Sequence, residues 1–204
     1  MKTIRQIEAT RKTYHRDPTL NTIHRASLLV PEIPNAIAEI SFINHFLLKR
    51  QYSNVACKIT AIDTNGKKIK SKLHKIDTPI VYNFKLTGMV TDPVSNYMVE
   101  FFAPDNMFIP FPAVMINHHG KNFINQVHAF NRVLNDVFED DDINSHQVKE
   151  ASIDLVVNED TDTFLLFTTG PLPCKDSLEI EVITPNQSMV KNFDIDLPRF
   201  GVKR

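Results

Sequence analysis

Glycine, cysteine and tryptophan are scarce in this chain, whose 204 residues include five glycines, two cysteines and no tryptophan. The G-x-G-x-x-G, G-x-S-x-G and Walker A motifs are all missing, so common dehydrogenase, hydrolase and NTPase functions have no support. Cys57 and Cys174 lie far apart outside any C-x-x-C pair, which argues against a disulfide framework or a thiolate zinc site. The lack of tryptophan weakens a carbohydrate-binding interpretation, because sugar sites commonly use large aromatic faces.

Long hydrophobic runs are also missing. No segment approaches the roughly 20 apolar residues that a membrane-spanning helix needs, and the N-terminal "MKTIRQIEATRKTYHRDP" lacks the apolar stretch of a signal peptide. With 42% hydrophobic and 23% charged residues, the composition is typical of a folded soluble protein. We therefore expect a cytoplasmic protein with an N-terminal arm or short helix at residues 1–20 and one domain at residues 21–204.

Charge is distributed unevenly along the chain, although the formal net charge is −1. Residues 1–102 contain 15 Lys and Arg against 8 Asp and Glu, a net +7, whereas residues 103–204 contain 8 against 16, a net −8. A surface that binds nucleic acid along the whole chain would need an overall basic excess. The sequence thus argues against nucleic acid as a partner, and the two halves are expected to attract each other.

Most of the chain reads as short β-strands separated by turn residues. The first half has "HRASLLV", "AIAEISFI", "NVACKITAI", "KIKSKLHKI", "PIVYNFKL", "NYMVEFFA" and "FPAVMIN", and the second half has "EASIDLVV", "TFLLFTT", "SLEIEVI" and "KNFDIDL". Asn65-Gly66 between the third and fourth segments is a strong hairpin signal. So many short strands with short connections predict a mainly all-β fold, an antiparallel β-sandwich, with an immunoglobulin-like topology preferred.

One stretch, residues 117–142, breaks the β pattern. Phe123, Val127, Phe130, Leu134 and Val137 recur at spacings of four, three, four and three, the apolar stripe of an amphipathic helix. This periodicity predicts one inserted helix over residues 122–138, beginning at Asn122 as its N-cap. A helix inserted into a β-sandwich would cover an end or face of it, where pockets often form.

The histidines around this helix are the candidate metal ligands: His118, His119 and His128. Imidazole is the commonest ligand for transition metals, so their convergence would create a site for a divalent transition metal. In an enzyme, His119 and His128 would act as ligands or as acid and base, and Arg132 would orient an anionic substrate. The spacing matches no established zinc motif, and adjacent residues of an extended chain point to opposite faces. Separate surface or hydrogen-bonded histidines are therefore the alternative.

The same residues also fit an anion site without metal. His119 and Lys121 lie just before the expected helix N-terminus, whose free amides favour a phosphate or carboxylate. Asn125 could donate a hydrogen bond to the same anion. A small anionic ligand is therefore a candidate partner.

Two further charged segments have both functional and structural explanations. Lys68, Lys70 and Lys72 alternate with apolar or small residues and predict one lysine-lined strand face, either a protected edge strand or a dock for an anionic partner. The acidic runs 139–142 and 159–162 either bind calcium, the alternative cofactor to a transition metal, or form solvated turns.

Two classes of function fit these observations. The first is a noncatalytic binding or assembly module that recognises a protein, a second copy of itself or an anionic ligand. The second is a metal-dependent or anion-substrate enzyme with a pocket at residues 117–132. We favour the module, because β-sandwiches commonly present loops and faces for recognition and no established catalytic motif is present.

Overall fold

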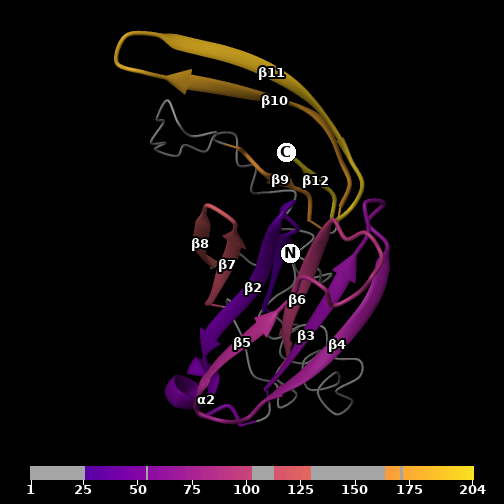
Figure 1. Cartoon of the computed structure of the whole chain (residues 1–204), viewed down its shortest axis with the longest axis vertical. Helices are drawn as coiled ribbons and strands as arrows, with labels where there is room; N and C mark the ends of the chain where they lie inside the picture. The colour runs from indigo at the N-terminus through magenta and orange to yellow at the C-terminus, as the bar shows by residue number, and fades with distance from the viewer. Residues whose placement is uncertain (1–25, 54, 103–112, 130–163, 171) are drawn as a thin grey trace, which may run out of the picture.

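The computed structural model describes residues 26–53, 55–102, 113–129, 164–170 and 172–204. These residues form mainly antiparallel β-structure, which confirms the mainly all-β prediction (Figure 1). Within the described ranges no helix is long and apolar enough to cross a membrane. The N-terminal arm predicted for residues 1–20 lies outside the described residues.

Eight strands form two four-stranded sheets. The first sheet has the order β1-β6-β3-β4, with β1 (Ala26–Pro31), β6 (Asn96–Phe102), β3 (Val55–Ile62) and β4 (Lys68–Ile76). The second has the order β5-β2-β7-β8, with β5 (Val81–Lys85), β2 (Ala36–Ile43), β7 (Val114–Gly120) and β8 (Ile124–Ala129). These strand orders do not confirm the immunoglobulin-like topology.

One hydrophobic cluster joins the two sheets. Alternate residues of each strand point to the same side of a sheet, so each sheet contributes one apolar face. From the first sheet come Leu28, Val30, Val55, Cys57, Ile59, Ala61, Tyr97, Val99 and Phe101, and from the second Ala38, Ile40, Phe42, Val114, Ile116 and Ala129. Burial raises the pKa of the Cys57 thiol far above its usual range, so this cysteine is an inert hydrophobic residue.

Aromatic rings form the centre of this cluster. Phe101 of β6 contacts Phe42 of β2 edge to face at 5.1 Å between ring centroids, and it contacts Phe46 at the same distance. Phe46 belongs to the short helix α2 (His45–Arg50), where the side chain of Asn44 caps the first turn by accepting a hydrogen bond from the Leu47 amide. The rings therefore connect α2 and both sheets.

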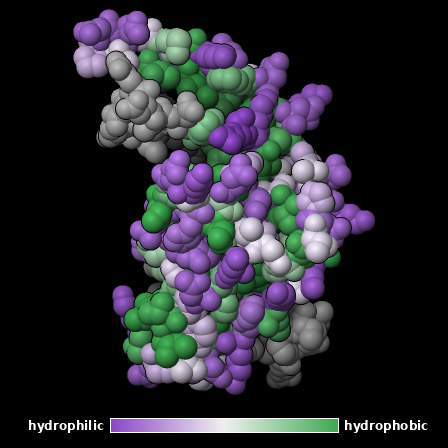
Figure 2. Space-filling model, viewed as in Figure 1, coloured by the Kyte–Doolittle hydropathy of each residue, from purple (hydrophilic) through white to green (hydrophobic). Residues whose placement is uncertain are grey.

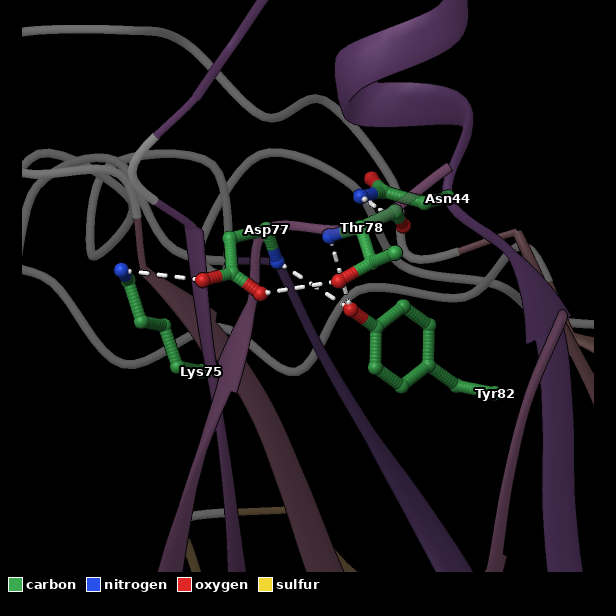
Figure 3. Close-up of polar contacts among 5 residues, drawn as sticks. All are labelled: Asn44, Lys75, Asp77, Thr78 and Tyr82. Atoms are coloured by element: carbon green, nitrogen blue, oxygen red, sulfur yellow. Dashed lines mark hydrogen bonds and ion pairs between the residues drawn. The ribbon is translucent and has the colours of Figure 1, made fainter. Parts of the chain in front are cut away.

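A polar corner carries the chain from β4 in one sheet to β5 in the other (Figure 3). The hydroxyl of Tyr82 accepts hydrogen bonds from the backbone amides of Asp77 and Thr78, at 3.1 and 3.0 Å. Asn44 donates to the Thr78 carbonyl at 3.0 Å, and Lys75 pairs with Asp77 at 2.9 Å. The hydrogen bond from Lys75 lowers the pKa of the Asp77 carboxyl. These contacts fix the turn that holds the two sheet edges together.

The hairpin predicted at Asn65-Gly66 is confirmed between β3 and β4. Gly66 has φ +75°, a left-handed conformation that glycine adopts without strain, and Asp63 accepts hydrogen bonds from the amides of Asn65 and Lys67. A Cβ atom at Gly66 would lie 2.0 Å from the carbonyl oxygen of Arg199. Glycine is therefore required both by the turn and by the close packing of the C-terminal segment against it.

The helix predicted over residues 122–138 is wrong for residues 124–129, which form β8 instead. Residues 130–138 lie outside the described residues. The Gly120 amide donates to the Phe123 carbonyl, so Lys121 and Asn122 form the loop of a β7–β8 hairpin, and Asn122 is not an N-cap. The reason is tertiary: the edge of β7 offers a row of backbone partners, and pairing with it satisfies the same amides that a helix would satisfy locally.

The C-terminal residues form two small two-stranded sheets. Strand β9 (Phe167–Thr168) pairs with β12 (Val202–Lys203), and β10 (Cys174–Ile183) pairs with β11 (Ser188–Leu197) over ten residue pairs. We call β10, β11 and the turn between them the C-terminal arm. In Figure 1 the arm extends beyond the two four-stranded sheets as a long curved hairpin.

Replacing the central aromatic residue tests this core. Phe101 is fully buried between the sheets, so Phe101→Ala should lower the free energy of unfolding by about 3 to 5 kcal/mol. Urea denaturation measures the change. Leu73→Ala is the control, because this side chain is 68% exposed and its removal should change stability by no more than about 0.5 kcal/mol. Equal effects of the two variants would contradict the proposed core.

Candidate functional site

The structure places His118 and His119 on opposite faces of β7. His118 points toward the other sheet and is 3% exposed, and its Nε2–H donates a hydrogen bond to the Pro31 carbonyl at 2.8 Å. The carbonyl can only accept, so this bond assigns the proton to Nε2. The buried Nδ1 atom has no hydrogen-bond partner within the described part of the chain. His118 is thus a core residue of the sheet interface.

His119 lies on the outer face of the second sheet and pairs with a carboxylate. Its Nε2 lies 2.7 Å from Oε1 of Glu39 on the neighbouring strand β2, and the two side chains are 38% and 22% exposed. Such a partly exposed pair contributes little to stability, on the order of 0 to 1 kcal/mol.

The strand register keeps His128 away from His119 although both lie on the outer face. His119 pairs with Ile124, whereas His128 pairs with Met115, four residues along β7 from His119. Four residues of a strand span about 13 Å, whereas two imidazoles that bind one metal ion each lie about 2 Å from it. The structure therefore does not assemble the three histidines, and the described residues contain no group of three His, Cys, Asp or Glu side chains that could hold a metal ion.

The other residues considered for a pocket at this turn do not converge either. Asn125 pairs with His118 in the β7–β8 register and so lies on the face opposite to His119. Lys121 is exposed in the hairpin loop, where no helix N-terminus exists to bind an anion. Arg132 and the acidic runs 139–142 and 159–162 lie outside the described residues.

The predicted lysine face follows β4, the edge strand of the first sheet, but a register shift divides it. Ala61 pairs with Lys70 and the next residue, Ile62, pairs with Lys68. Consecutive residues of a strand point to opposite faces and paired residues share a face, so Lys68 and Lys70 point to opposite sides. Lys70 and Lys72 remain together on one side, both exposed, followed by His74, whose ring stacks on Phe84 at 4.3 Å.

A half-buried polar cluster at one end of the sheets was missed by the sequence interpretation. Thr87 donates to both carboxylate oxygens of Glu32 at 3.3 Å and accepts from the Ala38 amide at 2.8 Å, while the Tyr97 hydroxyl also bonds to Glu32. Burial raises the pKa of the Glu32 carboxyl above its ordinary value of 4.5, against the lowering effect of these hydrogen bonds and of nearby His118. Isolated Glu, Thr and Tyr residues carry no sequence signal for such a cluster.

The C-terminal arm has two chemically different faces. The register β10–β11 pairs Leu178 with Phe193 and Val182 with Met189 on one face, and Glu179 with Asn192 on the other. The apolar face consists mainly of Leu178, Ile180, Val182, Met189, Phe193 and Ile195. The opposite face carries Lys175, Glu179, Glu181, Asp194 and Asp196, and toward the tip also Ile183 and Val190. Figure 2 shows hydrophobic and hydrophilic residues side by side on this projection.

Apolar exposure increases toward the tip of the arm. Ile195 near the base is 4% exposed, whereas Val182 is 38%, Met189 59% and Ile183 74% exposed. Thr184 and Gln187 close the tip through a backbone hydrogen bond of 2.8 Å and a bond from the Thr184 hydroxyl of 3.0 Å. The tip is thus an ordered turn flanked by accessible hydrophobic side chains.

The base of the arm is fixed to the sheets. Phe200, 3% exposed, packs with Ile62 and Met98 on the outer face of the first sheet, and its carbonyl accepts a hydrogen bond from the Asn96 side chain. The Thr169 hydroxyl donates to the Pro198 carbonyl at 2.6 Å and accepts from the Gly201 amide at 2.7 Å. These contacts hold the segment directly after β11, so the arm projects from a rigid support.

No family model, curated protein or solved structure matches this chain. Its function must therefore be inferred from the arrangement of its own residues.

The pKa of Glu32 generates a pH-dependent prediction. An acid with a raised pKa in the folded state stabilises the fold fully below its unfolded pKa and loses this contribution as pH rises through the folded pKa. Glu32→Gln removes this loss, so the melting temperature of the variant relative to wild type should rise as pH increases from about 4 to 7. Thermal melts at several pH values measure the difference, and Glu179→Gln controls for removing an exposed carboxylate. A difference that shrinks over this range would refute the burial argument.

Proposed function

We propose that this chain is a noncatalytic protein-binding or assembly module and that the C-terminal arm is its contact surface. The observation that carries the proposal is the exposed apolar surface at the end of an ordered, anchored hairpin. Contiguous apolar side chains on a projecting element are typical of interaction sites, because their contact with water is unfavourable until a partner covers them.

The energetics of the hairpin support this proposal. An isolated two-stranded hairpin is only marginally stable in water, so ten residue pairs extending from a fold need a reason beyond the stability of the domain. The anchor residues Thr169 and Phe200 immobilise the base before any partner arrives. A preorganised element loses less conformational entropy on binding, which favours affinity.

The enzyme alternative at residues 117–132 has less support. The contact that favours it is the His119–Glu39 pair, in which an imidazole lies beside a carboxylate. The other two histidines expected at this site do not lie beside the pair. His118 is buried on the other face of β7, and His128 is about 13 Å away along the sheet. An exposed pair without a second converging group gives little basis for positioning a substrate.

Site-specific photo-cross-linking tests the arm as a contact surface. A photoreactive amino acid replaces Ile183 at the tip, and in a matched variant it replaces Val81, an exposed apolar residue on β5. After irradiation in the native host cells, the Ile183 variant should yield discrete products heavier than the monomer, because a partner covers this position, and the Val81 variant should not. Denaturing gels followed by mass spectrometry identify the products. A yield at Ile183 no greater than at Val81 would contradict the proposed function.

A further inference from the structure

The strand edges that the fold leaves unpaired indicate which kind of partner the arm binds. Within the described ranges, β10 pairs only with β11, and β4 pairs only with β3. An unpaired edge presents a row of backbone amides and carbonyls that another strand can satisfy. The chain thus carries both halves of a strand-addition contact, two edges of nine and ten residues.

The charges on the two edges are complementary. On one face of β4, Lys70 and Lys72 are two residues apart and exposed, and on one face of β10, Glu179 and Glu181 have the same spacing and exposure. Among the described residues, neither glutamate forms an ion pair within the chain. If the two edges pair with these faces aligned, a row of two carboxylates lies beside a row of two ammonium groups.

The opposite faces match in the same alignment. Leu73 follows Lys72 and points to the other side of β4, between Ser71 and Lys75, and its side chain is 68% exposed. The corresponding face of β10 carries Leu178, Ile180 and Val182. Because strand faces alternate with a period of two, placing Glu179 and Glu181 beside the lysines necessarily places this apolar row beside Leu73. The same register therefore brings opposite charges together on one face and apolar side chains together on the other.

We propose that β10 of one copy adds to the β4 edge of a second copy, extending the sheet β1-β6-β3-β4 by the two strands of the arm. This inference rests on the proposed function of the arm and names its partner as the same chain. The lysines that protect β4 against indiscriminate strand pairing here select for an acidic strand. The overall charges of the two elements favour the same head-to-tail contact, because β4 carries four lysines and no acidic residue, whereas the arm carries five acidic residues and two lysines.

The contact joins two different surfaces, so a pair of copies still has one unused arm and one unused β4 edge. Such a heterologous contact extends beyond a dimer into a ring or an open chain of copies. The average mass should consequently increase with protein concentration without stopping at two copies. It should decrease with added salt, because the charge pairs lie at exposed edges.

Charge reversal in the full chain tests this contact directly. Sedimentation velocity measures the average mass of wild type, of Lys70→Glu/Lys72→Glu, and of Glu179→Lys/Glu181→Lys, at about 0.05 M and about 0.5 M salt. At low salt the wild type should associate, and each double variant should associate at least about tenfold more weakly. Lys49→Glu/Lys121→Glu is the matched control, since it reverses two exposed lysines away from both edges.

Mixing the two double variants provides the decisive measurement. Each variant alone carries like charges on both edges, but the reversed β4 of one is complementary to the reversed arm of the other. An equimolar mixture should recover association to within a fewfold of wild type, as should the quadruple variant. Circular dichroism confirms that each variant is folded.

A wild type that stays monomeric at low salt, or a mixture that stays dissociated with both variants folded, would overturn the second-copy proposal. The proposed function would survive that result if the cross-linker at Ile183 captured a different protein. It would fail if Ile183 gave no product above the Val81 control. The two experiments therefore separate the identity of the partner from the role of the arm.

Discussion

Burial of Phe101 between the two four-stranded sheets is the interaction on which the rest of the structure depends. Its ring contacts Phe42 from the opposite sheet and Phe46 from α2, so one side chain connects three elements that are distant in sequence. A sheet with one apolar face is stable only when that face is covered. The alternation of β2 and β6 places the apolar residues that cover each other on the inner faces, and this leaves the outer faces and the edges for other contacts.

The outer face of the first sheet has a second role as the support of the arm. Phe200 covers Ile62 and Met98 there, and Gly66 allows the backbone of Arg199 to approach the β3–β4 turn. Thr169 joins the strand β9 to the turn after β11. These small contacts fix the direction in which twenty hairpin residues extend from the body, and a binding surface gains affinity from such a fixed position.

Charge and apolar surface occur together at the two unpaired edges. The lysines of β4 and the glutamates of β10 each share their strand with exposed hydrophobic residues on the opposite face. Hydrophobic contact supplies binding free energy without direction, whereas charge selects the partner and the register. In the proposed strand-addition contact, these two contributions act on opposite faces of the same strand edge.

Local sequence patterns determined most of the strands. The segments "AIAEISFI" and "KIKSKLHKI" coincide with β2 and β4, and Asn65-Gly66 marks the hairpin between β3 and β4, because period-two alternation and turn propensity act within a few residues. Residues 124–129 were decided by tertiary structure: Val127 fits a helical stripe, but the edge of β7 offers backbone partners that no local pattern reveals. The faces of the candidate residues also depend on register. Cross-strand pairing fixes which side chains become neighbours. The register of β7 and β8 places His128 far from His119, and His118 points into the core. The register shift between Ala61 and Ile62 places Lys68 and Lys70 on opposite faces of β4.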